Sequence, residues 1–258
     1  MVNWRENVNT LNLPRTSRTT TTRAESSWTG LYWVGSISAT LFVILIVVPI
    51  MLLFIAPQPP LSDGTALLQY IAAHKSVYLT ELVSFVGLSL PALVVFLALY
   101  VALERVNSSF AAIGAMIGIA SETIALAYNS SPPSLNPGLL QLSNQYVVAS
   151  SEAHRVALAT AAEGLMAVSN AVNGAGILTA LGILILSWVM RQDFFWRNAG
   201  TLGIVTGVFG IVSEVLRDVI GPGYFLYGML LPAWFVAVGW KLYLLGKRNR
   251  ELSQGGAS

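Results

Sequence analysis

Residues 152–176 read EAHRVALATAAEGLMAVSNAVNGAG, and the fold can be worked out from this stretch. Its charged and amide side chains recur at helical spacings, at Glu152, Arg155, Glu163, Asn170 and Asn173. Residues spaced in this way lie on roughly one face of an α-helix. The sequence after Glu163 has no charged residue up to Met190. We therefore predict one long helix that carries a polar stripe, runs into a membrane and ends near Met190.

The composition of the whole chain also requires a membrane. Hydrophobic residues make up 55% of the 258 residues and charged residues only 10%, whereas an ordinary soluble domain has about 25% charged residues. One soluble core cannot bury this much apolar surface, so much of it must face lipid. The chain has no cysteine, which excludes a disulfide framework, a thiolate metal site and a cysteine nucleophile.

Six apolar segments are long enough to cross a hydrocarbon core of about 30 Å. They are residues 31–55, 77–103, 110–128, 152–190, 201–220 and 224–245. Two shorter segments, 63–76 and 139–151, are predicted as helices on the membrane surface. The expected fold is an all-α, polytopic membrane protein with six transmembrane helices and one or two short extracytoplasmic interfacial helices.

The basic residues are distributed unequally between the two sides of the membrane. With six spans the termini share one side, which holds eleven Lys and Arg, while Lys75, Arg155 and Arg217 are the three on the other. The positive-inside rule then places both termini in the cytoplasm and the chain in the cell membrane. We expect a disordered cytoplasmic tail (1–27), a six-helix transmembrane domain (28–246) and a cytoplasmic tail (247–258).

Four of the apolar segments each carry one glutamate, and this topology places all four in the outer half of the bilayer. Buried carboxylates are costly and normally face a bundle interior or a wet cavity. We therefore expect an outward-facing polar pocket built from Glu81, Glu122, Glu163, Glu214, Asn170, Asn173, His154 and Arg155. Alternatively, these side chains only hold helices together, reach headgroup water or form local ion pairs, as Glu214 can with Arg217.

One pentapeptide occurs twice. Gly118-Ile-Ala-Ser121-Glu122 matches Gly210-Ile-Val-Ser213-Glu214 in four of five positions, at an offset of 92 residues. Both copies come late in segments that run in the same direction across the membrane, an arrangement that internal repeats produce in transporters. The glycines of these two segments, at 114, 118, 203, 207 and 210, predict close helix packing.

Sequence motifs for catalysis are absent. There is no Walker loop, GxSxG or HExxH sequence, so no catalytic residue, cofactor or nucleic-acid partner is assigned, and the chain is not expected to be an enzyme. His74, Glu152 and His154 are conceivable zinc ligands, but their spacing matches no known motif, so no metal site is assigned.

The last span reads Pro232-Ala-Trp234-Phe-Val-Ala-Val-Gly239-Trp240, and a proline-rich loop with a short helix follows the first span. In these features and in the order of its spans the chain resembles a bacterial multi-pass family catalogued as domain of unknown function 4386. The likeness covers roughly Trp28 to Leu245. It implies a protein of the bacterial inner membrane and supplies no catalytic residues.

The expected function is that of an integral membrane protein that binds or conducts a small solute or lipid through the polar pocket, as a transporter would. A first alternative is a structural or accessory subunit of a membrane complex, or a homo-oligomer, with contacts through the glycine-rich spans. A second is a metal-dependent membrane hydrolase. The lipid bilayer is the partner in every case.

Overall fold

The computed structural model describes residues 28–61, 63–128 and 134–255, so the predicted tail 1–27 lies outside the described residues. Every regular element in these ranges is helical, which confirms the all-α prediction. The helices are α2 (Thr29–Ile55), α3 (Gly64–Ala73), α4 (Lys75–Gly87), α5 (Ser89–Tyr128), α6 (Pro137–Val148), α7 (Glu152–Val172), η1 (Asn173–Ala175), α8 (Gly176–Met190), α9 (Arg197–Val215), α10 (Arg217–Ile220), η2 (Gly221–Gly223) and α11 (Tyr224–Gly255).

Within the described residues, five helical segments are long and apolar enough to cross a membrane. They are Thr29–Leu52, Lys75–Tyr128, Glu152–Met190, Arg197–Val215 and Tyr224–Leu252. Large apolar side chains such as Ile37, Met51 and Met116 point outward from them and are more than half exposed. So large an exposed apolar surface is stable only against lipid. The chain is therefore a multi-span helical membrane protein.

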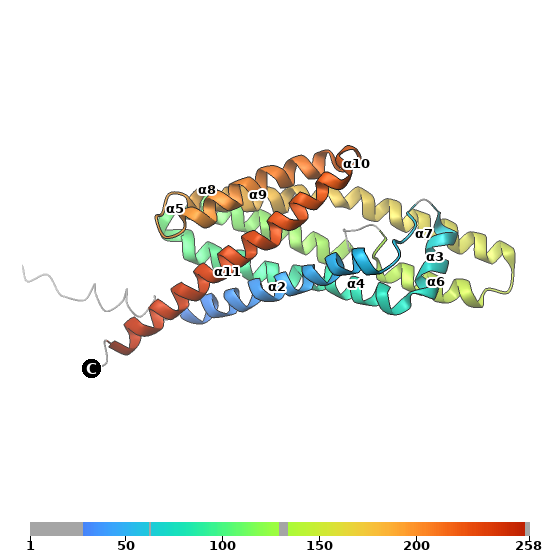
Figure 1. Cartoon of the computed structure of the whole chain (residues 1–258), viewed down its shortest axis with the longest axis horizontal. Coiled ribbons are helices and arrows are strands. Elements are labelled where there is room, and N and C mark those ends of the chain that lie inside the picture. Colours follow the sequence, from blue (N-terminus) through green and yellow to red (C-terminus); the bar gives the residue numbers. More distant parts are fainter. Residues whose placement is uncertain (1–27, 62, 129–133, 256–258) are drawn as a thin grey trace, which may run out of the picture.

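Helix α5 folds back on itself at Asn107, whose φ of −158° and ψ of 93° are not helical (Figure 1). The Asn107 side chain accepts a hydrogen bond from the backbone N–H of Phe110 at 3.3 Å, which caps the second half of α5. The chain thus reverses direction between the predicted segments 77–103 and 110–128.

Helix α8 lies between the second half of α5 and α9, and glycines allow it to approach both. A Cβ atom on Gly182 of α8 would lie 2.9 Å from the carbonyl oxygen of Gly114 and from the amide nitrogen of Gly118. A Cβ atom on Gly207 of α9 would lie 2.8 Å from the carbonyl oxygen of Ala180. The close packing predicted for these glycines is thus found inside the chain, where α8 already covers their faces.

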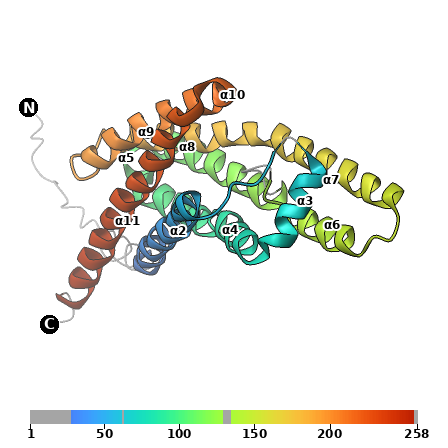
Figure 2. The same cartoon turned by 45° about the vertical axis from the view of Figure 1, so that its right-hand side comes forward.

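A hydrophobic cluster that is smaller than the main core lies at one end of the molecule, where α3, α6 and α7 meet (Figures 1 and 2). Both short helices that the sequence predicts are present, and Asp63 caps α3 by accepting a hydrogen bond from Thr65. The segment from α7 through α8 has 39 residues and would be about 58 Å long at 1.5 Å per residue. Only part of it can lie within hydrocarbon, and it is broken at η1 rather than continuous as predicted.

Helix α11 continues to Gly255, past the end of the predicted sixth span at residue 245. Lys247, Arg248 and Arg250 are good helix formers, and no proline or glycine lies between Gly246 and Gly255. The gap between the predicted segments 201–220 and 224–245 contains Gly221, whose φ of 51° favours glycine.

The buried phenol of Tyr78 connects α4 to the segment that leads into α6. Its oxygen lies 2.9 Å from the carbonyl oxygen of Asn136 and 3.0 Å from that of Ser134, and it accepts the Asn136 N–H at 3.0 Å. Tyr78→Phe leaves these groups without this partner, so we expect unfolding free energy to fall by about 1–3 kcal/mol. Thermal unfolding in detergent measures this, with Tyr128→Phe, at an exposed position, as control. Equal stability of the two variants would contradict the assignment.

Candidate functional site

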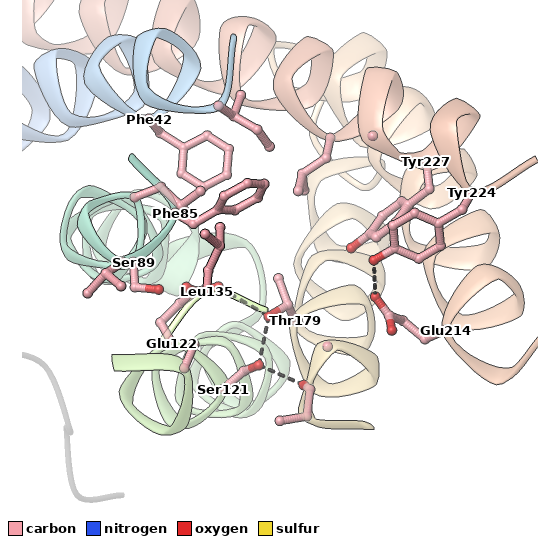
Figure 3. A pocket seen from close by; sticks show the side chains of 18 of the residues that line it. Phe42, Phe85, Ser89, Ser121, Glu122, Leu135, Thr179, Glu214, Tyr224 and Tyr227 are labelled. Atoms are coloured by element: carbon pink, nitrogen blue, oxygen red, sulfur yellow. Dashed lines mark hydrogen bonds between the residues drawn. The ribbon is translucent and has the colours of Figure 1, made fainter. Parts of the chain in front are cut away.

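A cavity of about 360 Å³ lies among α2, α4, α5, α8, α9 and α11 (Figure 3). Most of its wall is apolar, with Phe42 and Ile46 from α2, Phe85 from α4, and Phe225 and Leu231 from α11. Ligand pockets in proteins have volumes of about 300–1,000 Å³ and combine apolar walls with a few placed polar groups. The cavity has the size and lining of a small-molecule site.

Glu122 supplies one polar corner of the cavity. It lies late in α5, and only 5% of its surface is exposed. The Thr179 hydroxyl of α8 donates to its carboxylate at 3.1 Å. The Thr179 hydroxyl oxygen is 2.7 Å from that of Ser121, and Ser121 donates to the carbonyl oxygen of Ala175 at 2.8 Å. These contacts form a chain of oxygens from Glu122 to the helix break at η1 (Figure 3).

Glu214 supplies a second corner, and its charge is neutralised inside the chain. Arg217, one turn further along, forms an ion pair with it and also donates to the hydroxyl oxygen of Tyr224 at 3.0 Å. The Tyr224 hydroxyl in turn donates to Glu214 at 2.8 Å. The Arg217 guanidinium also lies 5.0 Å from the centre of the Tyr224 ring, within the range of a cation–π contact.

The two copies of the pentapeptide occupy corresponding places. The second half of α5 and α9 pack on α8, and Glu122 and Glu214 both line the cavity. Ser121 and Ser213 are both buried. The structure therefore brings together two of the four glutamates predicted to share a pocket, and they are the two that end the repeated sequence.

Of the other predicted site residues whose side chains the structure describes, none lines this cavity. The side chains of Glu163, Asn170, His154 and Arg155 are exposed on α7, whereas Leu158, Ala162 and Met166 of the same helix are buried. Glu163 accepts the N–H of Gly64 at 3.2 Å, joining α7 to α3. The side chain of Asn173 lies outside the described residues.

Glu81 is buried on α4, away from the cavity lining. It lies near α3, where burial raises the pKa of the Tyr70 phenol above its usual value and the Glu81 charge adds to that rise. The Tyr70 hydroxyl donates to the carbonyl oxygen of Pro57 at 2.7 Å. Glu81 thus belongs to the smaller cluster at the end of the molecule.

The residues considered as zinc ligands are not assembled into a site. Among the described residues, no three His, Asp or Glu side chains lie together in a way that could hold a metal ion. His74 stacks on Tyr70 with ring centres 4.7 Å apart, and Glu152 and His154 are exposed at the start of α7.

Several lining residues were not predicted. The repeated pentapeptide could have indicated Ser121, because Ser121 directly precedes Glu122 in that sequence. Thr179 and Tyr224 lie one helical turn or less beyond helix breaks, so their positions depend on how η1 and η2 orient the following helices. Phe42 and Phe85 are ordinary apolar residues of long apolar segments, and nothing in their spacing distinguishes them from lipid-facing neighbours.

A search of curated proteins and a search of solved structures gave no match to this chain. The family model described as Domain of unknown function (DUF4386) matches residues 37–247. That range contains the whole wall of the cavity, including Glu122, Glu214 and Tyr224. The match covers well over half of the chain, which therefore belongs to this family of domains of unknown function.

Proposed function

We propose that this protein binds a small amphipathic molecule in the cavity between its membrane helices, as a solute- or lipid-binding membrane protein or transporter. The observation that supports this most strongly is the shared cavity wall. Two carboxylates from different helices, α5 and α9, line one largely apolar space of about 360 Å³. Apolar walls favour the body of such a ligand, and the few polar groups fix its orientation.

The same proposal includes six membrane crossings with both termini in the cytoplasm. The reversal of α5 at Asn107 supports it, because the segment Lys75–Tyr128 then makes two passes. The proposed crossings, together with the unequal numbers of Lys and Arg on the two sides of the membrane, put the cavity in the outer half of the bilayer. The structure also weakens the accessory-subunit alternative, because α8 covers the glycine faces that would have met a partner.

Gly228 offers a direct test of whether the cavity is the binding site. It lines the cavity, and a Cβ atom placed there would meet nothing within 4 Å. A Gly228→Phe side chain can therefore extend into the cavity without displacing the backbone. We expect it to reduce ligand binding at least tenfold while the protein remains folded, because it occupies the ligand's volume.

The assay is ligand-induced thermal stabilisation of the purified protein with 1-octanol and octylamine as amphipathic probes. Gly164→Phe is the matched control, because Gly164 is exposed on α7 with open space around it and does not line the cavity. The proposal fails if Gly228→Phe binds the probes as the parent protein does, or if neither probe binds the parent protein.

A further inference from the structure

The two carboxylates of the cavity differ in whether a positive charge compensates them. Glu214 is matched by Arg217 and by the Tyr224 hydroxyl, so that corner is close to neutral. Glu122 is just as deeply buried, but in the part of the chain that the structure describes no Lys, Arg or His forms an ion pair with it. An ionised carboxylate in this place is costly unless a positive charge compensates it.

The hydrogen bonds around Glu122 also leave a place for a donor. Three short oxygen–oxygen contacts join Glu122, Thr179, Ser121 and the carbonyl of Ala175, at 3.1, 2.7 and 2.8 Å. Thr179 and Ser89 donate to the Glu122 carboxylate, which as an anion has about four acceptor sites on its two oxygens. The sites that these two hydroxyls leave can accept hydrogen bonds from an ammonium group, which also supplies the compensating positive charge.

The remaining wall suits the apolar part of such a ligand. Phe42, Phe85 and Phe225 contribute aromatic rings to the cavity, and Ile46 and Leu231 contribute aliphatic surface. Aromatic faces attract cations as well as apolar groups. Arg217 already donates to Glu214 and Tyr224. The cavity is therefore a less favourable site for an anion than for a cation.

Resting on the proposed function, we infer that the ligand of this cavity is an organic cation, an amine with an apolar body whose ammonium group binds Glu122. Thr179 and Ser121 orient the carboxylate and accept or donate the remaining hydrogen bonds. The site thus distinguishes a cationic amphiphile from a neutral or anionic one of the same length.

Three probes with one chain length test this at pH 7: octylamine, 1-octanol and octanoate. A primary alkylamine is protonated there, like a lysine side chain with a pKa of about 10.4. Isothermal titration calorimetry on the purified full chain should show octylammonium binding at least tenfold more tightly than octanol, with octanoate weakest. Glu122→Gln should abolish the preference and leave octanol binding within about threefold of the parent value.

Glu163→Gln is the matched control, because it removes a carboxylate from the exposed face of α7 and should leave the preference intact. Thr179→Val is a second variant that retains the charge of Glu122 but removes its hydroxyl donor. It should weaken octylammonium binding severalfold more than it weakens octanol binding, and it serves as the test if Glu122→Gln does not fold.

The outcomes separate this inference from the proposed function. If octanol binds the parent protein as tightly as octylammonium and Gly228→Phe blocks both, the cavity binds ligands but not by charge, and the inference is wrong. The same holds if octanoate binds most tightly or if the preference survives both Glu122→Gln and Thr179→Val. If no probe binds in the cavity at all, the proposed function fails together with the inference.

Discussion

Gly182→Leu is expected to prevent α8 from packing against α5 and to lower the unfolding free energy by about 3 kcal/mol or more. The nearest atoms to a Cβ at Gly182 are backbone atoms of Gly114 and Gly118, at 2.9 Å. Backbone in the middle of a helix cannot move aside as a flexible side chain can, so the helices must separate. Inserting side-chain volume into a packed core typically costs about 1–3 kcal/mol, and a leucine at this crossing lies at or above that range.

Thermal unfolding in detergent, followed by tryptophan fluorescence, measures this effect. Gly164→Leu is the matched control, since the same exchange on the exposed face of α7 meets nothing within 4 Å. It should be neutral or stabilise by up to about 1 kcal/mol, because it removes glycine from a helix. If both variants unfold at the same temperature as the parent protein, the close crossing of α5 and α8 is contradicted.

Arg217→Met is expected to destabilise the protein by roughly 3 kcal/mol, because it leaves the Glu214 carboxylate buried without its cation. The Glu214 side chain is only 4% exposed, whereas that of Arg217 is 23% exposed. We therefore place the effect at the lower end of the range for breaking a buried pair, since water reaches the arginine. The hydrogen bond from Arg217 to Tyr224 is lost in the same variant.

A double-mutant cycle identifies the cause of this loss. Glu214→Gln combined with Arg217→Met removes both charges, and the amide that replaces the Glu214 carboxylate can still accept a hydrogen bond from Tyr224. The double variant should recover more than half of the stability that Arg217→Met loses. If Arg217→Met is as stable as the parent protein, or the double variant is no more stable than Arg217→Met, the ion pair between Glu214 and Arg217 does not stabilise this corner of the cavity.

Hydropathy was sufficient to predict most of the helical elements, although not the break at η1. The segments around α2, α9 and α11 follow from long, predominantly apolar runs, the reversal at Asn107 follows from the polar residues between two such runs, and the break at Gly221 follows from a glycine with positive φ. These features depend on local sequence, so one chain is enough to find them.

Only some of the residues that line the cavity could be predicted from the sequence. Assigning the glutamates to one depth grouped Glu122 with Glu214, which line the same cavity, but depth does not say which way a helix faces. Glu163 lies at the edge of the buried face of α7, where it accepts the N–H of Gly64 at the start of α3. Leu158, Ala162 and Met166 beside it pack against α3 and α6 rather than against the helices of the cavity. The rotation of α7 depends on that tertiary contact, which sequence spacing does not contain.

Our central claim is that an amphipathic cation enters the space between α2, α5 and α11 with its charge at Glu122. A crystal structure of the protein with 8-bromooctylamine tests it most directly, because the bromine gives an anomalous signal that locates the apolar end of the ligand. We predict a bromine peak inside the cavity, beside Phe42 or Leu231, with the amine within hydrogen-bond distance of Glu122. Bromine found only on the lipid-facing surface, with no ligand density beside Glu122, would contradict the claim.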